Sequence, residues 1–305
     1  IAGAGSGKTR TLTYRVAWLL DHGTDPWNIL LLTFTNKAAR EMTERVRSLI
    51  PLDLSRLWSG TFHSIANRIL RQHAEYLGYT PAFTIMDSDD RKSMIKSVVK
   101  SLKLDEKSTR FPKPEVLSSL FSLADNEGAN IRETLENAYP YLSNHLDAIL
   151  EVHDQYVARK QETNSMDFDD LLLNVVRLFQ EQEHLRALYG SRFQHILVDE
   201  YQDTNTIQER ILLLLGGERR NLCVVGDDDQ GLYRFRGATI RNILEFPALF
   251  DDGQCKQVKL TVNYRSHPDI IRFYNEWMKE QVWDDGTRVF RFAKQIVPRE
   301  DNFPD

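Results

Sequence analysis

The chain has 305 residues and a net charge of −5, and its 41% hydrophobic and 27% charged residues are typical of a globular protein. Its length favours two domains. No apolar run of about 18 residues and no charged-then-apolar leader is visible, so we expect no transmembrane helix and no signal peptide. The negative charge argues against a histone-like coating protein, although a local basic groove acts within a Debye length of roughly 10 Å. The two cysteines, Cys223 and Cys255, indicate neither a disulfide framework nor a zinc site, so a cytoplasmic setting is expected.

Apolar periodicity predicts the elements in chain order. Helices are predicted over 8–22 and 37–50, and buried strands over 29–34, 195–198, 221–225 and 257–260. Residues 87–160 show helical periods with few strand signals, which predicts an inserted all-helical subdomain. Strands that alternate with helices imply an α/β fold, with a parallel sheet and helices on both faces. The tail over 282–305 has weak periodicity and receives no assignment.

The first chemical signal is a glycine-rich segment that opens the first helix: Gly3-Ala4-Gly5-Ser6-Gly7-Lys8-Thr9. Glycines let backbone N–H groups turn inward around phosphate oxygens, Lys8 adds a charge at the β- and γ-phosphates, and the Thr9 hydroxyl can ligate Mg²⁺. Ala2 stands where the strict phosphate-loop pattern has glycine. The segment 36–39 lacks the aspartate with which GTPases read guanine, so ATP with Mg²⁺ is the expected nucleotide.

Two further predicted strands end in acidic residues. Asp199 suits Mg²⁺, directly or through water, and Glu200 suits a general base that polarises the attacking water. Gln230 follows a run of three acids, and its amide can hydrogen-bond both the γ-phosphate and the lytic water. The acids themselves, 227–229, fit a solvated turn equally well. The 191 residues from Lys8 to Asp199 exceed a minimal phosphate-loop domain, and the helical insertion accounts for the excess.

Seven segments then occur in a characteristic order: AGAGSGKTR (2–10), LLTFTNKAAREM (31–42), GTFHS (60–64), MDFDDLL (166–172), VDEYQDTN (198–205), VVGDDDQGLYRFRGA (224–238) and NYRSH (263–267). With them the chain resembles the UvrD/Rep/PcrA-like superfamily 1 DNA helicases over roughly residues 1–275. The resemblance implies a RecA-like phosphate-loop ATPase domain, 1A, over 1–87 and 161–257. A helical domain, 1B, would interrupt it over 88–160, and 258–305 would hold the start of a second RecA-like domain and the unassigned tail.

The resemblance also implies an activity and partners. It implies DNA-stimulated ATP hydrolysis, 3′-to-5′ translocation on single-stranded DNA and strand separation at DNA junctions, with repair or replication proteins as possible partners and no membrane. Arg265 would reach the γ-phosphate as an arginine finger, Tyr264 would lie near the adenine, and Arg10 belongs to the nucleotide-binding motif. The family's upstream glutamine motif and the remainder of the second RecA-like domain lie outside this sequence. The chain is therefore expected to hydrolyse ATP poorly and not to unwind DNA alone.

Three segments after predicted strand ends carry aromatic and polar side chains suited to single-stranded nucleic acid. The candidates are Phe34 and Asn36 in the first loop, Thr61 and His63 in the second, and Tyr233, Phe235 and Arg236 in the third. Phe62 is expected in the core, and Phe235 stands where the family often has Trp. Since Gln230 directly precedes the third loop, we hypothesise that this loop couples the γ-phosphate to the DNA platform.

A repair or replication helicase is the favoured function. The motor half of a recombination helicase–nuclease is an alternative within motors, and a nucleotide-dependent DNA-binding or regulatory module is an alternative outside them. A module without turnover is disfavoured by the intact set Lys8, Thr9, Asp199, Glu200, Gln230 and Arg265. A small-molecule kinase is disfavoured because it has no use for three aromatic loops and a large helical insertion.

Overall fold

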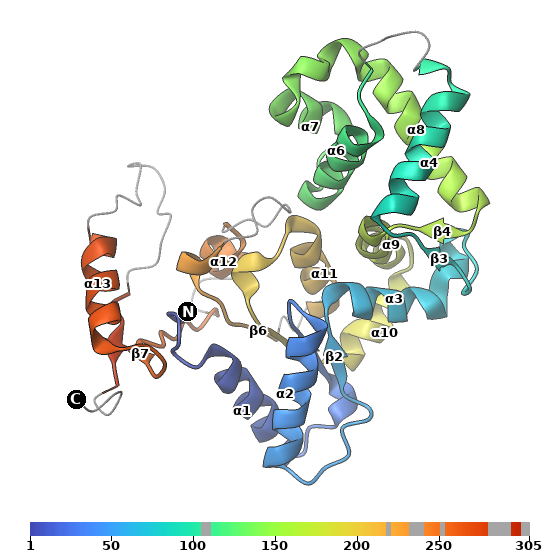
Figure 1. Cartoon of the computed structure of the whole chain (residues 1–305). Coiled ribbons are helices and arrows are strands. Elements are labelled where there is room, and N and C mark those ends of the chain that lie inside the picture. The colour runs from blue at the N-terminus through green and yellow to red at the C-terminus, as the bar shows by residue number, and fades with distance from the viewer. Residues whose placement is uncertain (105–110, 218–220, 232–240, 251–253, 280–293, 300–305) are drawn as a thin grey trace. The chain divides into compact units, whose positions relative to one another are not determined.

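The computed structural model describes residues 1–104, 111–217, 221–231, 241–250, 254–279 and 294–299 (Figure 1). In this part of the chain, two compact units form. The sheet unit comprises Ile1–Thr61, Tyr189–Asn205 and the described residues of Leu215–Asp305, and the helical unit comprises Phe62–Leu188 and Thr206–Leu214. No helix within the described ranges is both long and apolar enough to cross a membrane.

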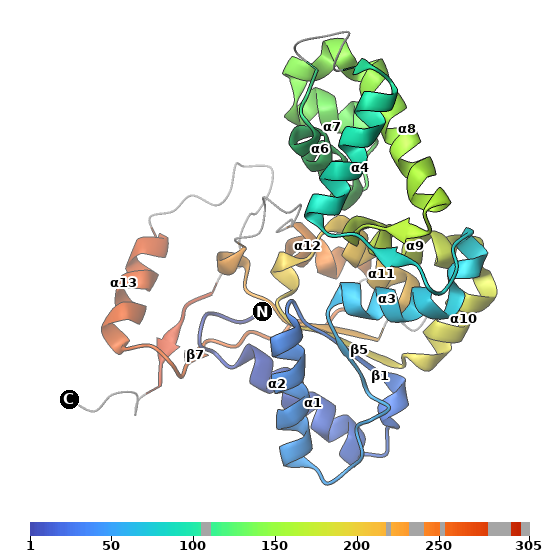
Figure 2. The same ribbon diagram turned by 45° about the vertical axis from the view of Figure 1, so that its right-hand side comes forward.

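The sheet unit is built on a parallel sheet. Among the described residues, its strands run in the order β2 (Trp58–Gly60), β1 (Ile29–Leu32), β5 (His195–Val198) and β6 (Leu222–Val224). Figure 2 shows β1 and β5 side by side. Leu32 lies opposite both Gly60 and Val198, and Val198 lies opposite Val224. The four strands therefore end level, and the residues that follow them share one edge, here named the C-terminal edge.

Helices and aromatic side chains cover the two faces of this sheet. On one face, α1 (Lys8–Asp21) and α2 (Asn36–Leu49) bury their apolar residues against Ile29, Leu31 and Leu197. The alternate residues of β1 point the other way, where Trp58 packs edge-on against Tyr189 and Phe193. Tyr189 belongs to α10 (Glu183–Arg192). The predicted α/β class with a parallel sheet is confirmed.

The predicted strand over 257–260 is wrong as a full strand. Of these residues, Leu260 alone pairs, in an isolated parallel bridge with Ala2. The N-terminal ammonium of Ile1 also donates to the carbonyl of Val258 at 2.9 Å, and the N–H of Leu260 donates to the carbonyl of Ile1 at 2.8 Å, so this segment lies along residues 1–3 without forming a strand. The backbone N–H of Ala2 also donates to the carbonyl of Gly226 at 3.0 Å, which places the start of the chain beside the end of β6.

The remaining described elements of the sheet unit are short. They are α12 (Arg241–Glu245), β7 (Val262–Asn263), α13 (Pro268–Lys279), β8 (Val297–Pro298) and 3₁₀ turns at Pro26–Asn28, Tyr201–Asp203, Asp228–Gln230 and Phe246–Leu249. β7 and β8 pair in parallel, so the residues around 297 lie beside the Asn-Tyr-Arg-Ser segment. The described part of the tail, left unassigned from sequence, thus has a defined place.

The helical unit contains the predicted insertion. Its described elements are α3 (Phe62–His73), β3 (Thr84–Ile85), α4 (Ser88–Ser101), α6 (Pro114–Glu127), α7 (Ile131–Ala138), α8 (Leu146–Glu162), β4 (Ser165–Met166), α9 (Phe168–Glu181), 3₁₀ turns at Ala74–Leu77 and Pro140–His145, and most of α11 (Thr206–Gly216). The short strands β3 and β4 pair in parallel, so the chain enters and leaves the helical segment between them at neighbouring positions. The domain boundaries expected at 88 and 160 stay a prediction.

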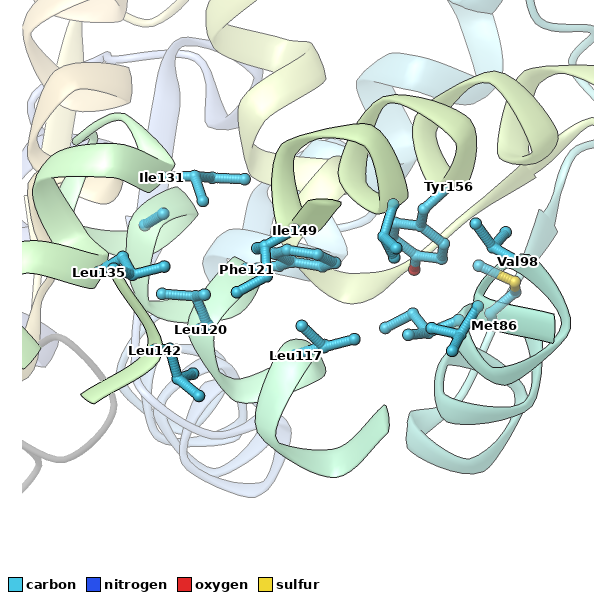
Figure 3. Close-up of a cluster of buried hydrophobic side chains, with 14 residues drawn as sticks. Met86, Val98, Leu117, Leu120, Phe121, Ile131, Leu135, Leu142, Ile149 and Tyr156 are labelled. Carbon is cyan, nitrogen blue, oxygen red and sulfur yellow. The ribbon is translucent and has the colours of Figure 1, made fainter. Parts of the chain in front are cut away.

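An apolar cluster holds helices α4, α6, α7 and α8 together. Figure 3 shows side chains from these helices pointing toward one another around Leu120, Phe121 and Ile149. The helical period explains the cluster, since Leu117, Leu120, Phe121 and Ala124 lie on one face of α6 and are all buried.

A buried group of ionised side chains lies beside this core. Lys160 donates to Asp167 at 3.2 Å and to Asp170 at 2.7 Å, and Arg91 pairs with Asp169. Asp167 also caps α9, since its side chain accepts from the backbone of Asp170 at 2.9 Å. Partners of both signs are required here, because an unpaired buried charge is strongly unfavourable.

The carboxylates of this group do not ionise alike. Burial and, after it, the nearby charges of Asp169 and Asp167 together raise the pKa of Asp125 to about 7. Burial opposes the charge of Asp167, but Lys160 and Arg91 hold the pKa of this carboxyl below its ordinary value. The folded-state pKa of Asp125 lies above its unfolded value. The free energy of unfolding is therefore lower where Asp125 is ionised, and it rises as pH falls through about 7.

We expect Asp125→Asn to raise the free energy of unfolding at pH of about 8, on the order of 1 kcal/mol. The variant should also lose part of the gain in stability that the wild type shows between pH of about 8 and about 5. Urea denaturation followed by circular dichroism at both pH values measures this difference. Glu151→Gln, an exposed change on α8, is the control, and an unchanged pH dependence in D125N would contradict the assignment.

Candidate functional site

The phosphate loop follows Ala2, which pairs with Leu260, and leads into α1 at Lys8. Gly5 and Gly7 have φ angles of 70° and 88°, in the left-handed region that glycine occupies without strain. Gly7 caps α1 with no side-chain hydrogen bond, so the first N–H groups of the helix face the loop. Ala2 is a buried, bridge-paired residue outside the left-handed region, so alanine replaces the glycine of the strict pattern without strain.

Lys8 and Thr9 meet the acids that follow β5 and β6. The Thr9 hydroxyl donates to Asp199 Oδ2 at 2.9 Å. The Lys8 ammonium lies 3.8 Å from Glu200 Oε2 and 3.8 Å from Asp227 Oδ2, and its side chain is 8% exposed. Residues far apart in sequence thus converge at the C-terminal edge, where the Thr9 hydroxyl, the Asp199 carboxylate and the Lys8 ammonium lie beside the phosphate loop.

Burial sets the charge state of Asp199. Burial raises the pKa of this carboxyl above its ordinary value, and the charge of Glu200 raises it further. The hydrogen bond from Thr9 and the charge of Lys8 act in the opposite direction. A divalent cation would favour the ionised form, because an opposite charge nearby lowers a carboxyl pKa.

Glu200 has an unusual backbone. Its φ of 51° lies in the left-handed region, which is uncommon for a residue other than glycine and concentrates at functional sites. The amide of Gln202 donates to Glu200 Oε2 at 2.9 Å and accepts from the backbone N–H of Asp227 at 2.9 Å. Gln202 therefore ties the end of β5 to the end of β6. Sequence reasoning missed this residue, although an amide so close to a strand-end acid pair was a usable signal.

The acids after β6 do not form a solvated turn. Asp227 and Asp228 are buried, and Asp229 is half-buried. The Gln230 amide donates to Asp227 Oδ2 at 2.5 Å. Lys294 pairs with all three acids, 227–229, although nothing in the sequence singled it out.

The Asn-Tyr-Arg segment lies directly on the phosphate loop. Asn263 donates to the carbonyl of Ala4 at 2.6 Å, and the backbone N–H of Tyr264 donates to the carbonyl of Gly5 at 2.9 Å. A Cβ at Gly5 would lie 3.0 Å from Cβ of Arg265, so the two residues are in contact. Tyr264 and Arg265 are exposed beside the loop, and Arg10 is exposed on α1. All three residues were predicted from the sequence, but Asn263, which anchors the Asn-Tyr-Arg segment to the phosphate loop, was not.

Three of the candidate nucleic-acid residues lie at the C-terminal edge. Phe34 follows β1 and is half-buried, Asn36 is the exposed first residue of α2, and Thr61 directly follows β2. Because these strands end level with β5 and β6, the three residues share the edge with Asp199 and Glu200. Tyr233, Phe235 and Arg236 lie outside the described residues, as does the greater part of the hypothesised coupling loop.

His63 lies in the first turn of α3 in the helical unit, and not in a loop as expected. Burial lowers the pKa of its imidazole. Its ring packs edge-on against Phe168 at 6.0 Å between centroids, and Phe168 is 53% exposed. Sequence reasoning did not single out Phe168, the exposed aromatic partner of His63. The expectation that Phe62 lies in the core is confirmed, since it is 7% exposed.

These features define a phosphate-loop nucleotide-binding protein with a parallel α/β sheet. Residues 1–251 match the UvrD/REP helicase N-terminal domain family, and the chain belongs to this family. It is 42% identical over 280 residues to the ATP-dependent DNA helicase PcrA of Staphylococcus epidermidis, covering 92% of this chain. The PcrA of Staphylococcus aureus is 41% identical over the same length. The chain spans 37% of the length of these relatives.

We expect Thr9→Val to lower the free energy of unfolding by about 1–3 kcal/mol without any nucleotide, because Asp199 loses its hydroxyl donor while staying buried. Thr11→Val is the matched control, since Thr11 lies in the same turn and its exposed hydroxyl donates to the carbonyl of Gly7. Thermal unfolding of both variants measures the difference. Equal losses in the two variants would show that the Thr9–Asp199 contact contributes nothing specific.

Proposed function

We propose that this chain is the nucleotide-binding part of an ATP-dependent DNA helicase that translocates 3′-to-5′ on single-stranded DNA in repair or replication. The observation that carries the proposal is the placement of Lys8 between Glu200 and Asp227. The same sheet edge bears Phe34 and Thr61, candidates for the nucleic-acid track. The PcrA relatives are described as ATP-dependent DNA helicases, which supports the same function. The cytoplasmic location expected from cysteine usage stays a prediction.

The residues around Thr9 fit a magnesium ion. Mg²⁺ prefers oxygen ligands, and the Thr9 hydroxyl and Asp199 carboxylate lie 2.9 Å apart beside the phosphate loop. A bound Mg²⁺ would neutralise charge on the phosphate oxygens. Lys8 would leave its two carboxylates to meet the β- and γ-phosphates, while the loop backbone binds phosphate oxygens through its N–H groups.

The remaining assignments concern the attacking water and the γ-phosphate. Glu200 would accept a proton from the water, since its carboxylate is held by Gln202 and faces Lys8. Gln230 would orient the same water through its amide. Arg265 lies against Gly5 and would stabilise charge on the γ-phosphate, and the exposed Tyr264 ring offers a surface for the adenine.

The nucleic-acid track would combine aromatic stacking with backbone-positioning polar groups. In the sheet unit, Phe34, Asn36 and Thr61 supply such groups. In the helical unit, His63 and the exposed Phe168 supply a second platform. Stacking tolerates any base, which suits a motor that must pass over every sequence.

We expect Glu200→Gln, introduced into the full-length protein that contains this chain, to lower DNA-stimulated ATP hydrolysis by roughly a hundredfold or more. Nucleotide affinity should remain, because Lys8 and the loop are unchanged. Phosphate release with and without single-stranded DNA measures the rate, and exposed Glu44→Gln is the control. A wild-type protein whose hydrolysis does not respond to DNA would contradict the helicase proposal, and translocation toward a label at the 3′ end would contradict the polarity.

We expect Phe168→Ala to weaken binding of single-stranded DNA by roughly tenfold, because one stacking platform contributes about 1–3 kcal/mol. The loss should be similar for oligo(dT) and for mixed sequences. Fluorescence anisotropy at fixed salt measures the affinity. Tyr141→Ala removes an exposed aromatic ring from the same unit and serves as the control, so equal losses in both variants would argue against a specific platform.

A further inference from the structure

Lys294 lies within a cluster of three carboxylates beside the candidate catalytic residues. Its ammonium pairs with Asp227 and Asp228, and it lies 2.9 Å from Asp229 Oδ2. Its side chain is 2% exposed, so these contacts are shielded from solvent. Acid oxygens from the three residues lie within 4.8 Å of one another, a spacing at which they repel strongly unless a cation lies among them.

The segment that carries Lys294 is held by β8 and by α13. β8 pairs with β7, and Ile296 is buried. The side chain of Asn275 on α13 donates to the Ile296 carbonyl at 2.7 Å and accepts its N–H at 3.2 Å. The hydroxyl of Tyr274, also on α13, donates to Asp229. The ammonium is therefore fixed from the same side that carries the Asn-Tyr-Arg segment.

Asp227 has two lysine neighbours with different tasks. Its Oδ2 lies 3.8 Å from Lys8, while its Oδ1 accepts from Lys294. Lys8 must give up its carboxylate partners to reach a triphosphate, and an uncompensated acid triplet would both hold Lys8 and repel the phosphates. The ammonium of Lys294 offsets this charge without occupying the phosphate loop.

The charge of Lys294 is secure near neutral pH. Burial alone would lower the pKa of its ammonium, but Asp227 and Asp228 raise this pKa above its ordinary value. In the part of the chain that the structure describes, the triplet is the one cluster of three or more His, Cys, Asp or Glu side chains spaced closely enough to hold a metal ion, and the Lys294 ammonium lies among its oxygens.

We propose that Lys294 is a positioning residue for nucleotide binding, which neutralises the acid triplet 227–229 so that Lys8 is free to bind the triphosphate. The proposal rests on the proposed nucleotide site. It assigns a function to a residue of the tail, outside the phosphate loop and the strand-end acids. It also predicts that the defect of a Lys294 variant depends on the number of acids left in the triplet.

The test compares four variants of the full-length protein: K294M, D228N, the double variant K294M/D228N and K279M. K294M should raise the KM for ATP roughly ten- to hundredfold, because a buried charge pair is broken, while kcat at saturating ATP changes by less than about threefold. K294M/D228N should recover most of the lost affinity, since one negative charge is removed with the positive one. K279M removes an exposed lysine of α13 and should bind ATP normally.

Equilibrium binding of a fluorescent, non-hydrolysable ATP analogue without DNA separates this proposal from the helicase function. Weaker binding by K294M that D228N restores supports the role of Lys294 even where DNA fails to stimulate hydrolysis. Unchanged binding by K294M, or a loss that D228N does not restore, overturns it and leaves a purely structural contact. If K294M does not fold, D228N alone should bind the analogue as tightly as the wild type or tighter, and weaker binding overturns the proposal. A wild type that binds no nucleotide overturns both.

Discussion

Lys8 is held between two carboxylates that arrive from different strands, and the site is arranged around this placement. Its ammonium lies 3.8 Å from both Glu200 and Asp227 in a nearly buried position. This arrangement requires β5 and β6 to end level, which their parallel register provides. Without a nucleotide, the acids compensate the buried lysine. A triphosphate offers a stronger anionic partner, so binding exchanges one set of charge pairs for another instead of burying a new charge.

The exchange of partners makes charge balance the main constraint on this edge of the sheet. Five carboxylates, those of Asp199, Glu200 and 227–229, gather within it, and Lys8 and Lys294 bring positive charge to them. Neutral donors complete the network, since Thr9 and Gln202 each donate to a carboxylate. When Lys8 moves to a polyanionic ligand, the acids 227–229 still need a cation to balance their negative charge. The buried Lys294 is placed to supply it.

The helical unit also contains buried acids whose charges are balanced by buried cations. Its apolar cluster holds helices α4, α6, α7 and α8 together, and the buried acids beside it are paired by Arg91 and Lys160. The partners do not ionise alike, because burial and neighbouring acids raise the pKa of Asp125 to about 7, whereas Lys160 and Arg91 keep that of Asp167 low. The unit therefore carries a pH-dependent contribution to stability that its apolar core does not share.

The sequence by itself determined the α/β class, the phosphate loop and the identity of the strand-end acids, because buried strands and glycine-rich turns leave local patterns. It erred at 257–260, where Leu260 forms an isolated bridge with Ala2 in place of a strand. Only the tertiary structure decided that Asp227 is buried, that Asn263 anchors the phosphate loop and that Lys294 enters the acid triplet. These contacts join residues up to 259 positions apart, and no local pattern of side chains records which distant partner will neutralise a buried charge.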